Sequence, residues 1–309
     1  MKSNRGITLI ALAITIIIML IIAAIGVAAL SGNSSLLTKT QEAKEGAEIK
    51  NEKSIIDLAI TNVTNNNKYG ELDGTELKKE LETNYKKQIR SVEISGGTVE
   101  ITFKSGRVYT ADASGSIERD VPVAYKKVEY IKSSGTQYIM TDIIPSDTTG
   151  IYARVASHNI VTNLIWFGSN GAGNSRLWIT NEKSKISLSW NEYMPTTSRP
   201  AISLDVVNTV KINFLNDRKK VYNDTEIDSN IATLNTNNYP MAIFAGNSSG
   251  SITLKSSISL YELKVSDGSK IIANFVPCYR DDDGEVGLYD TINGKFYENQ
   301  GSRDFLLPN

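Results

Sequence analysis

The sequence predicts a mainly β protein, in which an amino-terminal apolar helix and a small α+β head precede an antiparallel β-sandwich. Three observations lead to this fold class. Residues 7–30 carry no charged side chain, residues 36–63 are rich in helix formers, and residues 126–309 hold many short apolar or alternating runs separated by turn residues. The expected divisions are 1–6, 7–30, 31–119, a linker at 120–125, and 126–309.

Composition excludes several functions. The 309 residues have a formal net charge of -1, so the basic excess typical of nucleic-acid binding is missing and we expect no nucleic-acid partner. A single cysteine, Cys278, cannot form an internal disulfide, and a single histidine, His158, cannot make an imidazole metal cluster. The many Asn, Ser, Thr and Gly residues beside one cysteine favour an exported bacterial protein.

The apolar run 7–30 is long enough to cross a bilayer, because a helix of this length spans roughly 36 Å. Lys2 and Arg5 precede the run, and the first charge after it is Lys39, so we expect a cytoplasmic amino terminus and an extracellular carboxyl terminus. This predicts a single-pass cell-membrane protein exposed on the cell surface. One alternative is a signal peptide ending near Val27–Ala29, although the run is long for a signal peptide. A second alternative is a plain uncleaved anchor.

The head is predicted from helix and strand signals. Ser31–Ser35 should interrupt the helix, and a polar helix should follow over 36–63. Asp73 is placed to cap a shorter helix over 76–85. Three strands are expected at 91–94, 98–103 and 107–110. A stalk helix with a small packing module would give the same local pattern.

The region 126–309 reads as an all-β sandwich, because its strand-like runs follow one another at short intervals with no competing helical period. Trp166, Trp178 and Trp190 lie in these runs. Buried aromatic residues dominate sandwich cores, so we expect each of them in the core; the alternative places one on a concave face that stacks against sugars.

Candidate catalytic and metal-binding residues are few. A glycoside hydrolase needs two suitably placed carboxylates, and the nearest sequence pattern, Glu226–Ile227–Asp228, lacks a third acid. We therefore expect no catalytic residues and no enzyme activity. Asp281, Asp282 and Asp283 are weak candidate calcium ligands, because an acidic turn is the favoured explanation where Asp-Gly is an ordinary turn signal, and no other cofactor is expected. We expect His158 in a solvated loop and Cys278 in the core.

Residues 5–11, RGITLIA, resemble the processing site of type IV prepilins, including pilin-like proteins of Gram-positive bacteria. The resemblance implies that a prepilin peptidase cuts after Gly6 and that the new terminus, Ile7, is methylated. It also implies assembly with other pilin-like subunits through the apolar helix in the membrane. Ala11 departs from the pattern, because most pilins have a glutamate there that neutralises a neighbouring amino terminus in the filament.

Three segments of the carboxyl-terminal region, 128–143, 209–224 and 275–299, resemble laminin G-like, concanavalin A-like jelly rolls of bacterial and phage surface proteins. The last segment, FVPCYRDDDGEVGLYDTINGKFYEN, is the most specific of them. The resemblance implies a lectin-like sandwich of two antiparallel sheets, one of them curved.

Together these observations favour a non-enzymatic, cell-surface, pilin-like protein, a minor or tip pilin, whose lectin-like domain acts in adhesion by binding a glycan or protein ligand. Two alternatives stay open. One is a permanently membrane-anchored monomer with the same binding domain, and the other is a surface carbohydrate-active enzyme, which the lack of paired acids disfavours.

Overall fold

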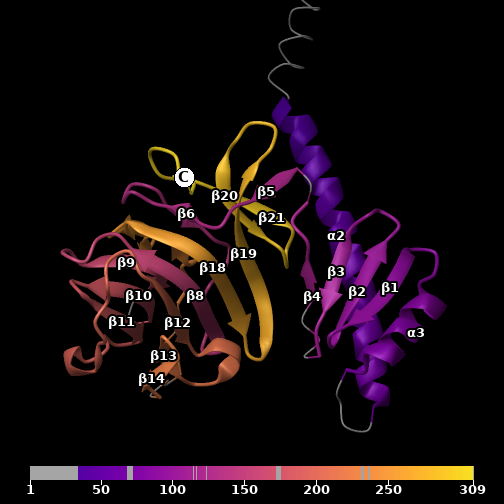
Figure 1. Ribbon diagram of the computed structural model, residues 1–309, viewed down its shortest axis with the longest axis horizontal. Coiled ribbons are helices and arrows are strands. Elements are labelled where there is room, and N and C mark those ends of the chain that lie inside the picture. The colour runs from indigo at the N-terminus through magenta and orange to yellow at the C-terminus, as the bar shows by residue number, and fades with distance from the viewer. Residues whose placement is uncertain are drawn as a thin grey trace, which may run out of the picture. The chain divides into compact units, whose positions relative to one another are not determined.

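We describe the protein from a computed structural model that covers residues 34–67, 72–113, 115, 117–122, 124–171, 175–229, 231, 233–235 and 237–308. The chain divides into two compact units, of which the first ends at Ser54 and the second covers Ile55–Asn309. Figure 1 labels the helices and strands.

The predicted membrane localisation needs correction. In the part of the chain that the structure describes, no helix is long and apolar enough to cross a membrane. The long helix found there is polar, with Lys44, Glu48 and Lys50 among its residues. This finding contradicts the prediction of a single-pass membrane protein with a cytoplasmic amino terminus. The apolar run 7–30 and the Gly6–Ile7 processing site lie outside the described residues.

Helix α2 (Ser34–Asn66) corresponds to the polar helix predicted to end near Val63. Its carboxyl-terminal half turns apolar side chains inward: Ile56 and Ala59 are fully buried and Val63 nearly so. Helix α3 (Gly74–Asn84) begins where the sequence predicts, because Asp73 caps it by accepting hydrogen bonds from the backbone N–H groups of Thr75 and Glu76.

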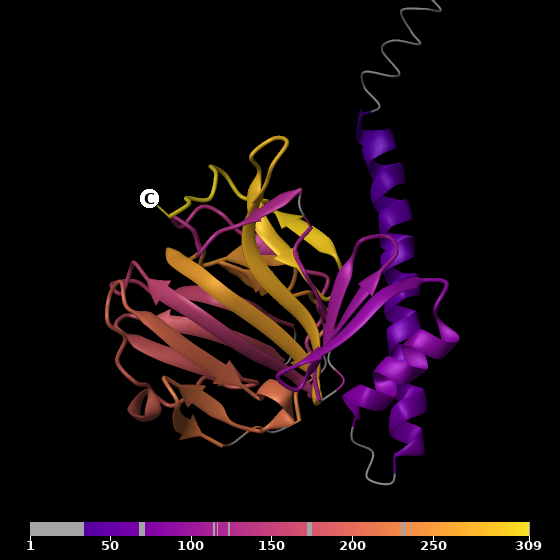
Figure 2. The same cartoon turned by 45° about the vertical axis from the view of Figure 1, so that its right-hand side comes forward.

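A four-stranded antiparallel sheet follows α3, in the order β1-β2-β3-β4. Its strands are β1 (Ile89–Ser95), β2 (Thr98–Phe103), β3 (Val108–Ala111) and β4 (Ile117–Arg119). Leu77 and Leu81 of α3 share one hydrophobic cluster with the sheet and with the end of α2. Figure 2 shows α3 lying beside the last turns of α2.

Two further sheets form the sandwich. In the described chain the first has seven strands: β7 (Ile139–Met140), β9 (Leu164–Asn170), β10 (Arg176–Glu182), β11 (Lys185–Trp190), β15 (Ala242–Ile243), β16 (Gly246–Ser248) and β17 (Ser251–Thr253). Its main order is β11-β10-β9-β15-β7. The pairings along this order are antiparallel, and the short β16 pairs with β9 in parallel.

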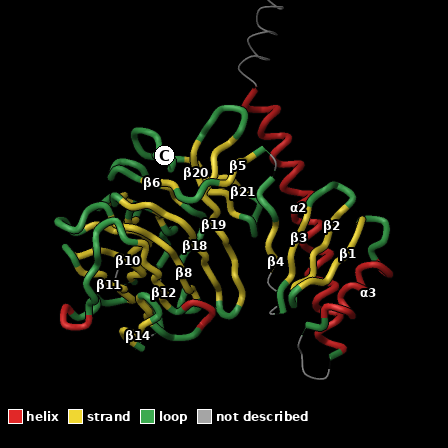
Figure 3. The backbone as a smooth tube through the Cα atoms, in the orientation of Figure 1, coloured by secondary structure: helices red, strands yellow, loops and turns green. Residues whose placement is uncertain are grey.

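The second sheet has ten strands in the described chain: β5 (Tyr125–Lys127), β6 (Ile131–Lys132), β8 (Thr149–Ser157), β12 (Val207–Ile212), β13 (Lys220–Tyr222), β14 (Thr225–Asp228), β18 (Ile258–Asp267), β19 (Lys270–Arg280), β20 (Val286–Asp290) and β21 (Lys295–Glu298). Its main order is β14-β13-β12-β8-β18-β19-β20-β21. In Figure 3 helix is confined, within this region, to short turns, η2 (Thr196–Ser198) and η3 (Phe214–Asn216).

One hydrophobic core joins the two large sheets. Alternate residues of β8 (Ile151, Ala153, Val155) and of β10 (Leu177, Ile179) belong to the same buried cluster. This is the pattern of two sheets packed face to face, with every second side chain turned inward. The prediction of a mainly β chain with antiparallel sheets is therefore confirmed, whereas the division at residues 119 and 126 stays a prediction.

Candidate functional site

A cavity of about 330 Å³ lies on the seven-stranded sheet, on the face turned away from the sandwich core. We call it the outer-face cavity. Its lining residues come from β9 and the residue before it, from β10, from the segment after β11 and from the segment after β17: Asn163, Leu164, Ile165, Trp178, Thr180, Glu182, Tyr193, Thr196, Arg199 and Leu254.

Strand β10 supplies the floor of the cavity through its two-residue period. Leu177 and Ile179 point into the sandwich core, so Trp178, Thr180 and Glu182 face the other way. Trp178 is nevertheless 93% covered, with 7% of its surface exposed, because the segment after β11 folds back over it. The strand thus presents an indole, a hydroxyl and a carboxylate in a row on one face.

An aromatic wall stands at one side of this floor. The ring of Tyr193 lies 6.4 Å from that of Trp178, centroid to centroid, at an interplanar angle of 61°. The Arg176 guanidinium makes cation–π contacts with both rings, since its Cζ lies 3.9 Å from the Tyr193 centroid and 5.0 Å from that of Trp178. Tyr193 is 54% exposed, so about half of its surface is available to a ligand.

A second arginine, Arg199, fixes the segment that follows β11, which we call the 191–202 loop. Arg199 forms an ion pair with Glu182 and donates from Nε to the Met194 carbonyl at 2.7 Å. The side chain of Arg199 is 7% exposed and that of Glu182 is 25% exposed. Farther along, the backbone N–H of Ile202 donates to the Ser184 carbonyl at 2.8 Å. The loop is therefore tied to the sheet at several points.

Two polar atoms of the lining lack a hydrogen-bond partner among the described residues. They are Trp178 Nε1, a donor, and Glu182 Oε1, an acceptor, and both are buried. Buried polar atoms are normally paired, and leaving one unpaired costs roughly 1–3 kcal/mol. A donor and an acceptor left unsatisfied in the lining of one cavity are what a hydroxyl-bearing ligand would satisfy.

A neighbouring cavity of about 410 Å³ shares Tyr193 with the outer-face cavity. Trp190, Lys220 and Asp228 also line it. Lys220 Nζ and Asp228 Oδ2 are 2.6 Å apart, so these charges already satisfy each other. This neighbouring cavity is more polar in its side chains, and among its described lining residues no buried side-chain atom lacks a partner.

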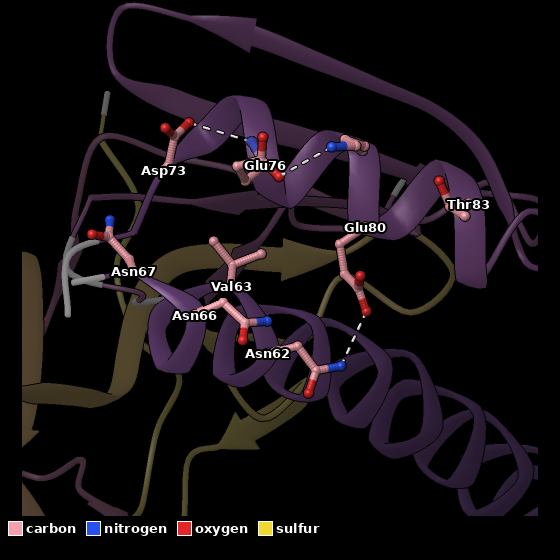
Figure 4. Close-up of a pocket in the computed structure, with 9 residues that line it drawn as sticks. Asn62, Val63, Asn66, Asn67, Asp73, Glu76, Glu80 and Thr83 are labelled. Atoms are coloured by element: carbon pink, nitrogen blue, oxygen red, sulfur yellow. Dashed lines mark hydrogen bonds and ion pairs between the residues drawn. The ribbon is translucent and has the colours of Figure 1, made fainter. Parts of the chain in front are cut away.

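A third cavity, about 480 Å³, lies between the ends of α2 and α3 (Figure 4). Its carboxylates are already engaged: Asp73 caps α3, Glu76 lies 3.6 Å from Lys79, and Glu80 accepts a hydrogen bond from Asn62 at 3.0 Å. No aromatic side chain lines it among the residues that the structure describes. Its polar groups therefore serve the helix ends around it.

The acidic turn predicted as a possible calcium site contains built-in cations. Arg280 binds Asp283 at 2.6 Å and lies 3.4 Å from Asp282, while Lys126 lies 3.6 Å from Asp281. Hydrogen bonds from Arg280 lower the pKa of Asp283 from its usual 3.8 to about 2. Among the described residues no group of three potential ligands is placed to hold a metal ion. Calcium binding stays a prediction.

The other acids considered from sequence are also paired. Glu226 and Asp228 lie on β14, at the end of the ten-stranded sheet. Glu226 is 3.0 Å from Lys219, and Asp228 is bound to Lys220. Glu226 and Asp228 are therefore counter-ions of two lysines at the edge of the sheet. Gly6 and Ile7, the predicted processing residues, lie outside the described part of the chain.

His158 is not the solvated loop residue that the sequence suggested. Its Nδ1 contacts Asp205, and its Nε2 lies 2.8 Å from Ser259 Oγ, so the three side chains are linked in the order Asp-His-Ser. That order resembles a hydrolase triad, but Ser259 is 2% exposed and lies beneath the histidine. A nucleophile must reach its substrate, so this arrangement is suited to bridging strands.

The sequence contained part of the signal for the outer-face cavity. The alternation in RLWITNE places Arg176, Trp178, Thr180 and Glu182 on one side of a strand. Nothing in the sequence pattern indicates that Tyr193 and Arg199 fold back over that side. Trp166 and Trp190 do belong to the core, as expected, whereas Trp178 lines the cavity.

Comparison with known proteins adds little. No family model matches the chain, and no curated protein matches it. Among solved structures, the chain is similar to a "putative carbohydrate binding protein" from Bacteroides ovatus at 9% sequence identity and a TM-score of 0.40, over 77% of this chain and 86% of that chain. Because a likeness at this level assigns neither fold nor function, the proposals below rest on the cavity.

Proposed function

We propose that this protein is a non-enzymatic, lectin-like binding protein that holds a glycan in the outer-face cavity. The observation that carries the proposal is the pairing, in one cavity, of an accessible aromatic wall with an unsatisfied donor and an unsatisfied acceptor. Binding sites commonly combine an apolar lining with a few convergent polar groups.

Sugar chemistry fits this lining. A pyranose ring has apolar C–H faces and a rim of hydroxyl groups, each of which both donates and accepts. The C–H face would lie against Tyr193, whose exposed ring offers area at little conformational cost. Rim hydroxyls would accept from Trp178 Nε1 and donate to Glu182 Oε1, the two atoms without partners among the described residues.

Binding is favoured over glycoside hydrolysis by the number of acids. Both main mechanisms of hydrolysis use two carboxyl groups on either side of the scissile bond. Among the described residues that line the outer-face cavity, Glu182 is the only acid, and it is already paired with Arg199. The cavity therefore supports recognition of a sugar.

A glycan array followed by calorimetry tests the proposal. Wild type should bind one or more neutral glycans, and Tyr193→Ala should weaken that binding about twofold to tenfold, because an aromatic contact contributes roughly 0.5–1.5 kcal/mol and 1.4 kcal/mol is tenfold. Tyr130→Ala is the matched control, since Tyr130 is a half-buried tyrosine that contacts Tyr261 on the other sheet. An array without hits, or equal binding by Tyr193→Ala, would contradict the proposal.

Two finer elements rest on sequence alone. Repeating the array with calcium and with a chelator tests Asp281, Asp282 and Asp283 as ligands. A role as a minor or tip pilin in adhesion, with a prepilin peptidase and pilin-like subunits as partners, is supported by residues 5–11. Mass spectrometry of the mature protein tests it: a methylated Ile7 terminus supports processing after Gly6, and a retained Met1 contradicts it.

A further inference from the structure

The charges in the outer-face cavity bear on which glycans enter it. Glu182 and Arg199 form one ion pair, but they are not equally accessible: the carboxylate side chain is 25% exposed and the guanidinium side chain 7% exposed. Arg199 also donates from Nε and Nη2 to the Met194 carbonyl. The cation is therefore the deeper and more fully bonded half of the pair.

The carboxylate, in contrast, is incompletely satisfied. Its Oε2 forms the ion pair with Arg199, and its Oε1 has no hydrogen-bond partner among the described residues. A second, independent observation points to a ligand at the same place: Trp178, itself 7% exposed, lines the cavity with its Nε1 also lacking a described partner. A carboxylate oxygen only accepts hydrogen bonds, so it requires a donor from the ligand.

Other cations near Glu182 do not line the cavity. Arg176 is 7% exposed, and its guanidinium lies against the Trp178 and Tyr193 rings. Lys185 lies opposite Glu182 in the β10–β11 register and therefore on the same face of the sheet. It is exposed and does not line the cavity, so solvent and salt screen its charge. The remaining described lining residues are neutral. Glu182 is thus the charge that a bound sugar meets first.

We infer that the outer-face cavity ranks glycans by charge, with amino sugars bound more tightly than neutral sugars and acidic sugars bound least. This inference rests on the proposed function and deepens it by naming the ligand class. An ammonium group would bring a positive charge to its hydrogen bond with the Glu182 Oε1 carboxylate oxygen. A hydroxyl group would donate to the same oxygen without a charge of its own, and a sugar carboxylate would meet a like charge.

Nine monosaccharide probes test the ranking: glucose, galactose and mannose, each beside its 2-amino and its uronic acid form. Binding is followed by protein NMR at low salt. Wild type should bind the amino form of a given hexose about threefold to tenfold more tightly than the uronic acid, which corresponds to roughly 0.7–1.4 kcal/mol. The difference should shrink as sodium chloride rises from about 20 to about 300 mM, because salt screens partly exposed charges.

Glu182→Gln keeps the size of the side chain but removes its charge and leaves Arg199 as the cavity's cation. The ranking should then invert, with the uronic acid bound most tightly. The matched control is Glu262→Gln, since Glu262 is a half-buried acid paired with Lys264 at 3.2 Å on the other sheet. That variant should keep the wild-type ranking.

The outcomes are distinguishable. If wild type binds neutral sugars but shows no charge preference, or if folded Glu182→Gln keeps the wild-type ranking, this inference is wrong while the proposed function stands. If none of the nine probes binds and the array also has no hits, both the proposed function and this inference are wrong. Should Glu182→Gln fail to fold, the salt dependence of wild-type binding decides: a salt-independent ranking overturns the inference.

Discussion

Two arginine side chains connect the 191–202 loop to strand β10 at the outer-face cavity. Arg176 contacts the rings of Tyr193 and Trp178, and Arg199 ties the loop to Glu182. Both bring a loop of irregular backbone onto a regular strand. The site is thus assembled by cations that contact aromatic rings, a carboxylate and a backbone carbonyl at the loop's two ends.

Removing Arg199 should destabilise the protein. In Arg199→Met, the Glu182 carboxylate loses its ion-pair partner while it remains largely covered, so the free energy of unfolding should fall by about 2–3 kcal/mol. Urea denaturation measures this. The double variant with Glu182→Gln should recover much of the loss, because no unpaired charge then remains. Equal losses in the single and double variants would show that the ion pair is not the cause.

The acidic turn should contribute stability that depends on pH. Arg280 lowers the pKa of Asp283 to about 2 from 3.8, so the stabilisation is present above about pH 4 and is lost as the pH falls toward 2. Because the Asp283 side chain is 49% exposed, the effect should be under about 1 kcal/mol. Asp283→Asn, compared with wild type by denaturation from pH 6 to pH 2, should differ most above pH 4. A difference that grows toward pH 2 would contradict the pairing.

At the scale of elements, α3 depends on its amino-terminal cap. Asp73 satisfies two backbone donors that would otherwise lack intrahelical partners, and α3 places Leu77 and Leu81 in the hydrophobic cluster shared with the four-stranded sheet. Asp73→Ala should cost about 1 kcal/mol of stability, measured by denaturant unfolding of the protein, whereas Asp73→Ser should cost less because serine also caps. Equal losses from the two substitutions would argue against capping.

Local patterns predicted the elements that local chemistry determines. The Asp73 cap, the polar helix and the three strands at 91–94, 98–103 and 107–110 appear close to their predicted positions. Strand β14 was not predicted, because TEID lacks an apolar alternation and is held by pairing with β13. Its strand character comes from a neighbour, which a local pattern does not contain.

At the scale of the whole molecule, the sequence predicted the class of architecture better than the site. Short runs of alternating apolar and polar residues indicated a mainly β chain, because successive side chains of a strand point to opposite faces and the apolar ones belong to the buried face. The cavity depends instead on which loop returns to which strand: Tyr193 comes from a loop and Trp178 from β10. Such pairings arise from tertiary packing. The local sequence around Trp178 was equally compatible with a place in the core.

The membrane prediction rested on the composition of residues 7–30 and on the charges that flank them, and among the described residues no helix is long and apolar enough to cross a membrane. Glycan binding is proposed instead from the outer-face cavity, whose lining residues the structure describes.

The most direct test of glycan binding at the outer-face cavity is a titration followed through the indole N–H resonances of the three tryptophans. Each lies in a different setting: Trp166 Nε1 donates to Asn181 at 3.0 Å in the core, Trp190 lines the neighbouring cavity, and Trp178 Nε1 has no described partner. A neutral glycan selected from the array should shift the Trp178 resonance and leave Trp166 unchanged. Glycan binding that moves only Trp190, or moves none of the three, would contradict this account.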